Sequence, residues 1–61
     1  MESISTVQEF DIFQILGSNR VFRCLFVFEN VIIFENEATL AVTIWQRDMD
    51  FIEVVILKSY Y

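Results

Sequence analysis

The sequence of 61 residues contains no histidine, no proline, one glycine and one cysteine. Histidine is the most common general base in enzymes and a frequent metal ligand near neutral pH, so its absence argues against both kinds of chemistry. The single glycine, Gly17, cannot form a glycine-rich loop that cradles a phosphate. The single cysteine, Cys24, leaves no internal disulfide and fits a reducing compartment. We therefore expect a cytoplasmic protein that is not an enzyme and has no catalytic residue, metal ligand or cofactor.

Basic residues are also scarce: four Lys and Arg stand against nine Asp and Glu, which gives a net charge of −5. A chain of this charge is repelled by nucleic-acid phosphates and by anionic membrane surfaces. Charged or amide residues interrupt every apolar run, for example at Arg23, Glu35 and Glu53, whereas a transmembrane helix needs ~20 mostly apolar residues. We predict no direct nucleic-acid binding and no membrane span.

Apolar residues, in contrast, are more abundant than in most soluble domains. The residue types AVILMFWYC make up 56% of the chain, above the ~45–50% that is usual even when glycine is counted. A chain of this length forms a single small domain, residues 1–61, and such a domain buries only ~60% of the surface that its unfolded form exposes. The sequence thus carries more apolar side chains than one small core can bury.

The first part of the chain carries two signals of a helix. Thr6 and Glu9 have the spacing of a capping box, in which a hydroxyl and a carboxylate satisfy free backbone amides at a helix start. Gly17 stands where a helix commonly ends in the left-handed conformation. We predict a short helix over residues 7–16. Residues 1–5 precede it, are mostly polar and are expected to be loosely ordered.

From Val21 onward, runs rich in Val, Ile and Phe alternate with short polar clusters, a pattern typical of β-strands separated by turns. The predicted strands cover residues 21–28, 31–35, 39–46 and 51–57. The polar clusters between them are short enough for hairpins between consecutive strands. The predicted fold is therefore α+β, with a short N-terminal helix followed by a four-stranded antiparallel meander.

Hairpin pairing assigns each side chain to one face of this sheet, because directly opposite residues share a face. With turns at 29–30, 36–38 and 47–50, both faces are apolar, although one face of an antiparallel sheet is normally solvated. One short helix covers one face only, so we predict that the other face binds a partner. We choose the face that carries the tryptophan, because aromatic residues are enriched at interface centres. The predicted partner-binding residues are Phe26, Phe28, Trp45, Ile52, Val54 and Ile56.

These patterns favour a small acidic protein-interaction module. It would act through its apolar sheet face as a homo-oligomer or as a small subunit of a larger protein assembly. Two alternatives remain open. The sheet could curl over itself, bury one face inside and cover part of the other with residues 1–17. The carboxylates could instead form an acidic decoy that binds the basic site of a nucleic-acid-binding protein.

Overall fold

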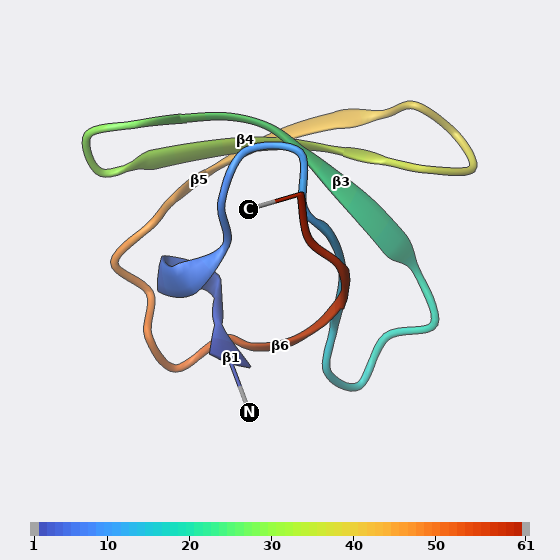
Figure 1. Cartoon of the computed structure of the whole chain (residues 1–61), viewed down its shortest axis with the longest axis horizontal. Helices are drawn as coiled ribbons and strands as arrows, with labels where there is room; N and C mark the ends of the chain where they lie inside the picture. Colours follow the sequence, from blue (N-terminus) through green and yellow to red (C-terminus); the bar gives the residue numbers. More distant parts are fainter. Residues whose placement is uncertain (1, 61) are drawn as a thin grey trace.

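The computed structural model describes residues 2–60, which form one six-stranded antiparallel sheet and a short 3-10 turn. The strands follow the order β1-β6-β2-β3-β4-β5 across the sheet. Figure 1 shows the sheet curling around a common centre, so that β6 and β1 lie opposite β4. In chain order the elements are β1 (Glu2–Ser3), η1 (Ile4–Thr6), β2 (Ile12–Ile15), β3 (Val21–Phe28), β4 (Val31–Asn36), β5 (Val42–Gln46) and β6 (Glu53–Lys58).

The predicted helix over residues 7–16 is wrong, and with it the α+β fold class: residues 2–60 contain no α-helix, and this segment is a turn followed by β2. The Thr6 hydroxyl donates to the Ser3 carbonyl oxygen at 2.8 Å, instead of accepting an amide at a helix start. The Asp11 carboxylate accepts the Gln8 backbone N–H at 3.0 Å. Such local side-chain bonds compete with helical hydrogen bonding, so Thr6 and Asp11 stabilise turns in place of a helix.

The backbone on both sides of β2 also departs from a helix. Phe10 has a φ of 72°, a left-handed conformation that does not occur inside an α-helix. Between Phe10 and Gly17 the chain forms the strand β2, whose residue Phe13 is fully buried in the core. Gly17 does take the left-handed conformation expected of it, with φ 88°, but in the turn between β2 and β3. The glycine signal therefore marks a hairpin and not a helix end.

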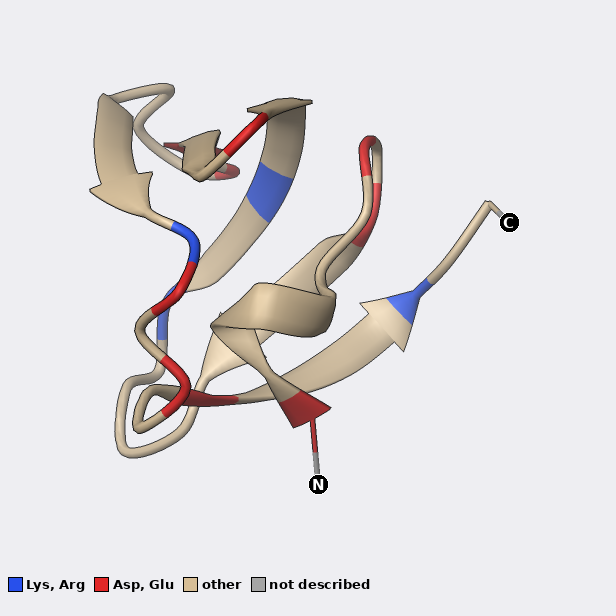
Figure 2. Cartoon of the chain, turned by 90° about the vertical axis from the view of Figure 1, so that its left-hand side faces the viewer, with Lys and Arg blue, Asp and Glu red and all other residues tan. Residues whose placement is uncertain are grey.

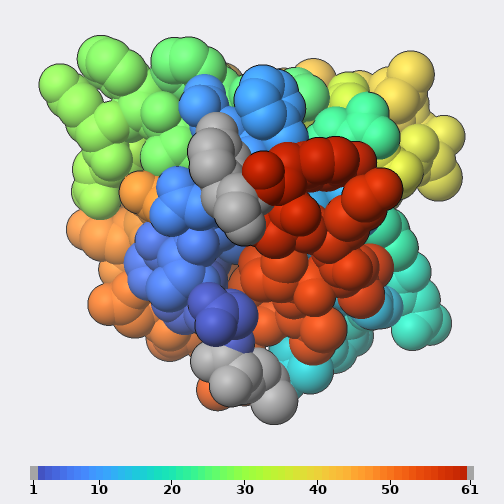
Figure 3. All heavy atoms as spheres, viewed as in Figure 1, coloured from blue at the N-terminus to red at the C-terminus, as the bar shows by residue number. Residues whose placement is uncertain are grey.

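The segment before β2 is part of the fold, although residues 1–5 were expected to be loosely ordered. Glu2 and Ser3 pair with Val54 and Glu53 of β6, and Figure 3 shows the start of the chain packed beside the end of the chain. Ile4 is fully buried. Met1, which the same prediction includes, lies outside the described residues.

The strand predictions from residue 21 onward are largely confirmed, but the meander is wrong at its last step. The 21–28 strand has the predicted bounds, and the other three strands differ by one to three residues at one end or at both. The last strand does not form a hairpin with β5. It crosses to the other side of the sheet and lies between β1 and β2. Residues 47–52 are therefore a connection across the curled sheet.

The core fills the centre of this curl, and we call the sheet face toward it the inner face. Three phenyl rings meet there, with centroid distances from Phe34 of 5.5 Å to Phe13 and 5.1 Å to Phe22. The Trp45 ring lies 5.1 Å from Phe34 in an edge-to-face arrangement. The fully buried apolar residues are Ile4, Val7, Phe13, Cys24, Ile32, Phe34 and Val54. One curled sheet thus supplies most of its own core, with Ile4 and Val7 closing it.

Candidate functional site

The six residues predicted to bind a partner lie on two different faces of the sheet. Phe26 and Phe28 of β3 are on the outer face, where they are 44% and 58% exposed and their rings stack at 6.1 Å. Val54 is fully buried on the inner face. The remaining three, Trp45, Ile52 and Ile56, are half-buried and pack against the core. The structure therefore brings Phe26 and Phe28 together and separates them from the other four.

Turn length explains the position of Trp45, whereas Ile52, Val54 and Ile56 are separated because the last strand pairs with β1 and β2 and not with β5. A three-residue turn at 36–38 would place Trp45 on the same face as Phe26, but in the structure Val42 is the residue opposite Glu35. The expected turn would have placed Thr39 opposite Glu35, so the pairing of β5 with β4 is shifted by three residues. A shift by an odd number of residues moves every side chain of a strand to the other face of the sheet. The Asn36 side chain holds the longer turn by accepting the Ala38 and Thr39 N–H groups at 2.8 and 3.1 Å.

A continuous apolar surface runs over the outer face of β3, β4 and β5. Phe26 is opposite Ile33 on β4, and Ile33 is opposite Ile44 on β5, so the three side chains form one row across the strands. A second pair, Phe28 and Val31, lies beside this row. We call this surface the outer patch. It consists of Phe26, Phe28, Val31, Ile33, Val42 and Ile44.

The sequence assigned part of the outer patch correctly. The two-residue turn at 29–30 is confirmed, and it places Phe26, Phe28, Val31 and Ile33 on one face as predicted. Val42 and Ile44 were assigned to the opposite face, yet they are the residues that complete the patch. The signal that could have found them is Asn36, because an asparagine side chain that bonds backbone N–H groups two and three residues on favours an extended turn.

The outer patch is as large as the largest apolar patches of soluble monomers, which are often functional. Ile44 is 65% exposed and Val42 is 58% exposed. The six side chains together expose roughly 400 Å² if a whole aromatic side chain carries about 200 Å². Contiguous apolar patches above a few hundred Å² are rare on soluble monomers and mark interaction sites. Polar residues border the patch, with Arg23 and Glu35 at one end and the Glu29–Asn30 turn at the other.

The strand that carries Val42 and Ile44 is also a free edge of the sheet. β5 is last in the strand order, and its partner is β4 on one side. The Arg47 N–H donates to the Asn30 carbonyl at 2.7 Å, and the Ala41 carbonyl accepts the Asn36 N–H at 2.9 Å. Backbone groups alternate in direction along a strand, so residues 41, 43, 45 and 47 face β4. The N–H and C=O groups of Val42, Ile44 and Gln46 therefore point away from the sheet.

This edge lacks the usual protection against pairing with another strand. Lysine, proline or a bulge commonly guards an exposed edge. No residue of β5 is charged, and the first charged residue after the strand is Arg47. The Arg47 guanidinium donates to the Val7 carbonyl oxygen at 2.8 Å, so it is held by the protein's own backbone. The free edge is open to a second strand.

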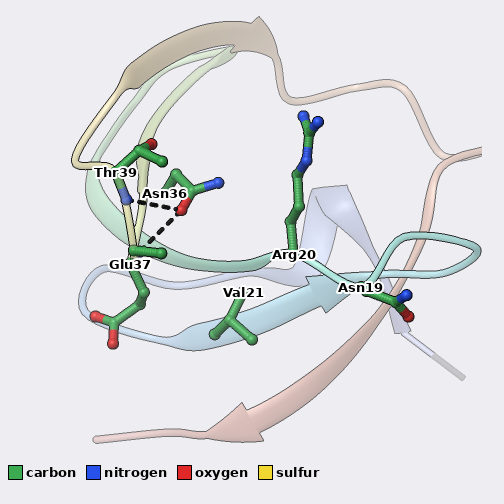
Figure 4. A pocket seen from close by; sticks show the side chains of 7 residues that line it. Asn19, Arg20, Val21, Asn36, Glu37 and Thr39 are labelled. Atoms are coloured by element: carbon green, nitrogen blue, oxygen red, sulfur yellow. Dashed lines mark hydrogen bonds between the residues drawn. The ribbon is translucent and has the colours of Figure 1, made fainter.

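A groove of about 570 Å³ lies between two turns, and the Asn36 and Glu37 side chains that line it make contacts within the protein. Figure 4 shows the Asn36 side chain bonded within its own turn, while the Glu37 carboxylate points away from it. Glu37 forms an ion pair with Arg23 at 2.8 Å. The lining residues are Asn19, Arg20, Val21, Asn36, Glu37, Ala38 and Thr39. These contacts stabilise the two turns.

Side chains that could ligate a metal are not clustered elsewhere in residues 2–60. No three His, Cys, Asp or Glu side chains of this range lie close enough together to hold a metal ion. Asp11 is 2% exposed and binds the Gln8 N–H through one carboxylate oxygen. In the same range, no helix has the length and apolar character needed to cross a membrane.

Cys24 is a buried core residue and should resist thiol reagents. Burial is the main cause that raises its pKa to about 11 from the ordinary value of 9.0, with Asp11 and Glu9 adding to the rise. Because the thiolate is the reactive form, a maleimide at pH 8 should modify the folded protein at least about tenfold more slowly than the urea-unfolded chain. Since the folded-state pKa is the higher one, this group favours the folded state below pH 9 and loses that effect as the pH rises toward 11. Mass spectrometry would measure the labelling rates. Equal rates in the folded and unfolded states would contradict the buried position of Cys24.

Comparison of the chain with protein-family models, with curated proteins and with solved structures finds no match.

Proposed function

We propose that this protein binds another protein chain through the outer patch, as a homo-oligomer or as a small subunit of a larger assembly. The observation that carries the proposal is the exposed apolar surface of Phe26, Phe28, Val42 and Ile44, which continues to the open edge of β5. The single unpaired cysteine favours the reducing cytoplasm as the place of this activity.

The outer patch has the composition of an interface centre with a polar rim. Two stacked aromatic rings lie beside branched aliphatic side chains, and aromatic residues contribute most of the binding energy in many interfaces. The charged residues Arg23 and Glu35 lie at the border, where they stay hydrated. A partner that covers the patch therefore removes apolar surface from water without burying an unpaired charge.

The acidic residues favour no second candidate. A decoy for a nucleic-acid-binding site needs carboxylates gathered on one surface. Here Asp11 is buried and Glu37 is paired with Arg23, and Figure 2 shows the remaining acidic positions on several separate segments. Their simplest role is to keep a protein with a large apolar patch in solution.

Phe28→Lys should abolish protein binding and leave the fold intact. Phe28 is 58% exposed on β3, so the lysine stays hydrated in the free protein but would be desolvated under a partner. Leu57→Lys is the matched control, because Leu57 is 50% exposed on β6, which lies two strands from β3 and four from β5 in the sheet order. Proteins retained from a lysate on the immobilised wild type and on each variant would be quantified by mass spectrometry.

We expect at least one protein other than this chain to be retained by the wild type and by Leu57→Lys. Its retained amount should fall at least about tenfold with Phe28→Lys. Circular dichroism would check that both variants are folded. If all three proteins retain the same set in equal amounts, the outer patch is not a binding site and the proposal fails.

A further inference from the structure

We infer that the open edge of β5 pairs with β5 of a second copy of this chain, antiparallel, about a two-fold axis at Ile44. The inference goes beyond the proposed function, because it assigns the strand edge as well as the sheet face. It rests on the proposed function in one respect, which is that pairing joins two outer patches into a single binding surface.

The backbone of β5 is self-complementary in this register. Val42, Ile44 and Gln46 direct their N–H and C=O groups outward, and they are evenly spaced about Ile44. An axis at Ile44 places Val42 opposite the partner's Gln46 and Ile44 opposite the partner's Ile44. Each of these opposed pairs exchanges two N–H···O bonds, so every outward group of the strand is satisfied. No other chain is needed to complete the edge.

The lack of charge on β5 permits a second copy at this edge although both copies are acidic. The protein has a net charge of −5, so two copies repel each other through most approaches. The β5 edge avoids this repulsion because no residue from Val42 to Gln46 is charged, and Arg47 is bonded to Val7. At the opposite end of the sheet the edge strand is β1, which has two residues and carries Glu2. β5 is thus the edge on which two acidic copies can meet.

Pairing also gives the outer patch the area that a stable interface needs. A standard protein interface buries ~800 Å² on each partner, and one outer patch exposes roughly half of that. In the dimer the row from Phe26 through Ile33 to Ile44 continues into the same row of the partner. The two patches then form one apolar surface on the same side of a continuous sheet. Dimerisation therefore prepares the binding surface for its partner.

A cysteine at the axis tests the register directly. Ile44→Cys would place two thiols opposite each other with Cα atoms about 5.5 Å apart, within the ~4.4–6.8 Å range of disulfides. Val42→Cys is the matched control, because the two copies of residue 42 would lie about 13 Å or more apart along the strands. With a mild oxidant we expect Ile44→Cys to become mostly covalent dimer, and Val42→Cys and the wild type to stay uncross-linked. Native Cys24 does not compete, because it is fully buried.

Val42→Pro tests the edge hydrogen bonds. The Val42 N–H points away from β4, and proline is tolerated at the first residue of an edge strand, so the monomer keeps its own bonds. In the dimer the change removes one N–H···O bond from each copy, and the dissociation constant should rise at least about tenfold in analytical ultracentrifugation.

Two results would overturn the inference. One is a wild type that stays monomeric at millimolar concentration. The other is a dimer in which Ile44→Cys does not cross-link. Phe28 lies two strands from the edge, so Phe28→Lys should leave dimerisation unchanged. A failure of the proposed function would therefore show in the binding test of Phe28→Lys and not in the dimerisation tests.

Discussion

Val54→Lys is expected to unfold the protein. Val54 has no exposed surface, and on the inner face of β6 it belongs to the main core. A lysine there must either bury an unpaired ammonium group or open the core, and changes of this kind cost more than ~4 kcal/mol. Small domains have a free energy of unfolding of ~5–15 kcal/mol and often less, so most of the stability is lost.

The neighbouring residue provides the control for this substitution. Val55 is 40% exposed on the outer face, so Val55→Lys should change the free energy of unfolding by less than ~1 kcal/mol. Thermal and urea unfolding followed by circular dichroism would compare the two variants with the wild type. If Val54→Lys melts like Val55→Lys, the inner and outer faces of β6 have been assigned the wrong way round.

Phe34→Ala should have the second largest effect, a loss of ~3–5 kcal/mol of stability. Phe34 is 1% exposed, and its ring contacts Phe13, Phe22 and Trp45 edge-on or nearly so. Alanine would remove the ring that connects the other three and leave a cavity that a curled sheet cannot fill without breaking strand pairing. Because Trp45 loses its contact, its fluorescence should shift to longer wavelength at temperatures where the wild type is folded.

The same substitution at an exposed phenylalanine separates loss of packing from loss of a phenyl ring. Phe28 is 58% exposed, so Phe28→Ala should cost less than ~1 kcal/mol and leave the Trp45 emission unchanged. Equal losses at Phe34 and Phe28 in urea titrations would show that Phe34 is not the centre of the aromatic cluster.

Strands with a two-residue turn could be predicted from the sequence, because their register depends on local residues alone. The run from Val21 to Phe28 and the turn at 29–30 fix which side chains of β3 and β4 share a face. A bulge between Cys24 and Phe26 then moves Cys24 to the inner face, where it is fully buried. No sequence signal marked this bulge, since its residues fit a regular strand equally well.

The N-terminal segment could not be predicted in the same way, because its local signals fit two structures. A threonine followed by a glutamate and then a glycine is typical of a helix, but the same residues also suit a turn before a hairpin. The decisive contacts are distant in sequence: β2 pairs with β6, and Phe13 lies opposite Ile56. Sheet pairing across 43 residues overrides local helix preference, and the position of the last strand was missed for the same reason.

The pairing of β6 with β1 and β2 also determines when this protein can fold during synthesis. β3, β4 and β5 are consecutive hairpins, which form early because their contacts are local. Val54 pairs with Glu2 and Ile15 and seals the core, so the core stays incomplete until residue 54 has left the ribosome. Until then Phe13 lacks its partner Ile56 on β6 and part of its cover. The nascent chain therefore exposes core surface until β6 joins the sheet, and partly folded chains that expose such surface are prone to aggregate.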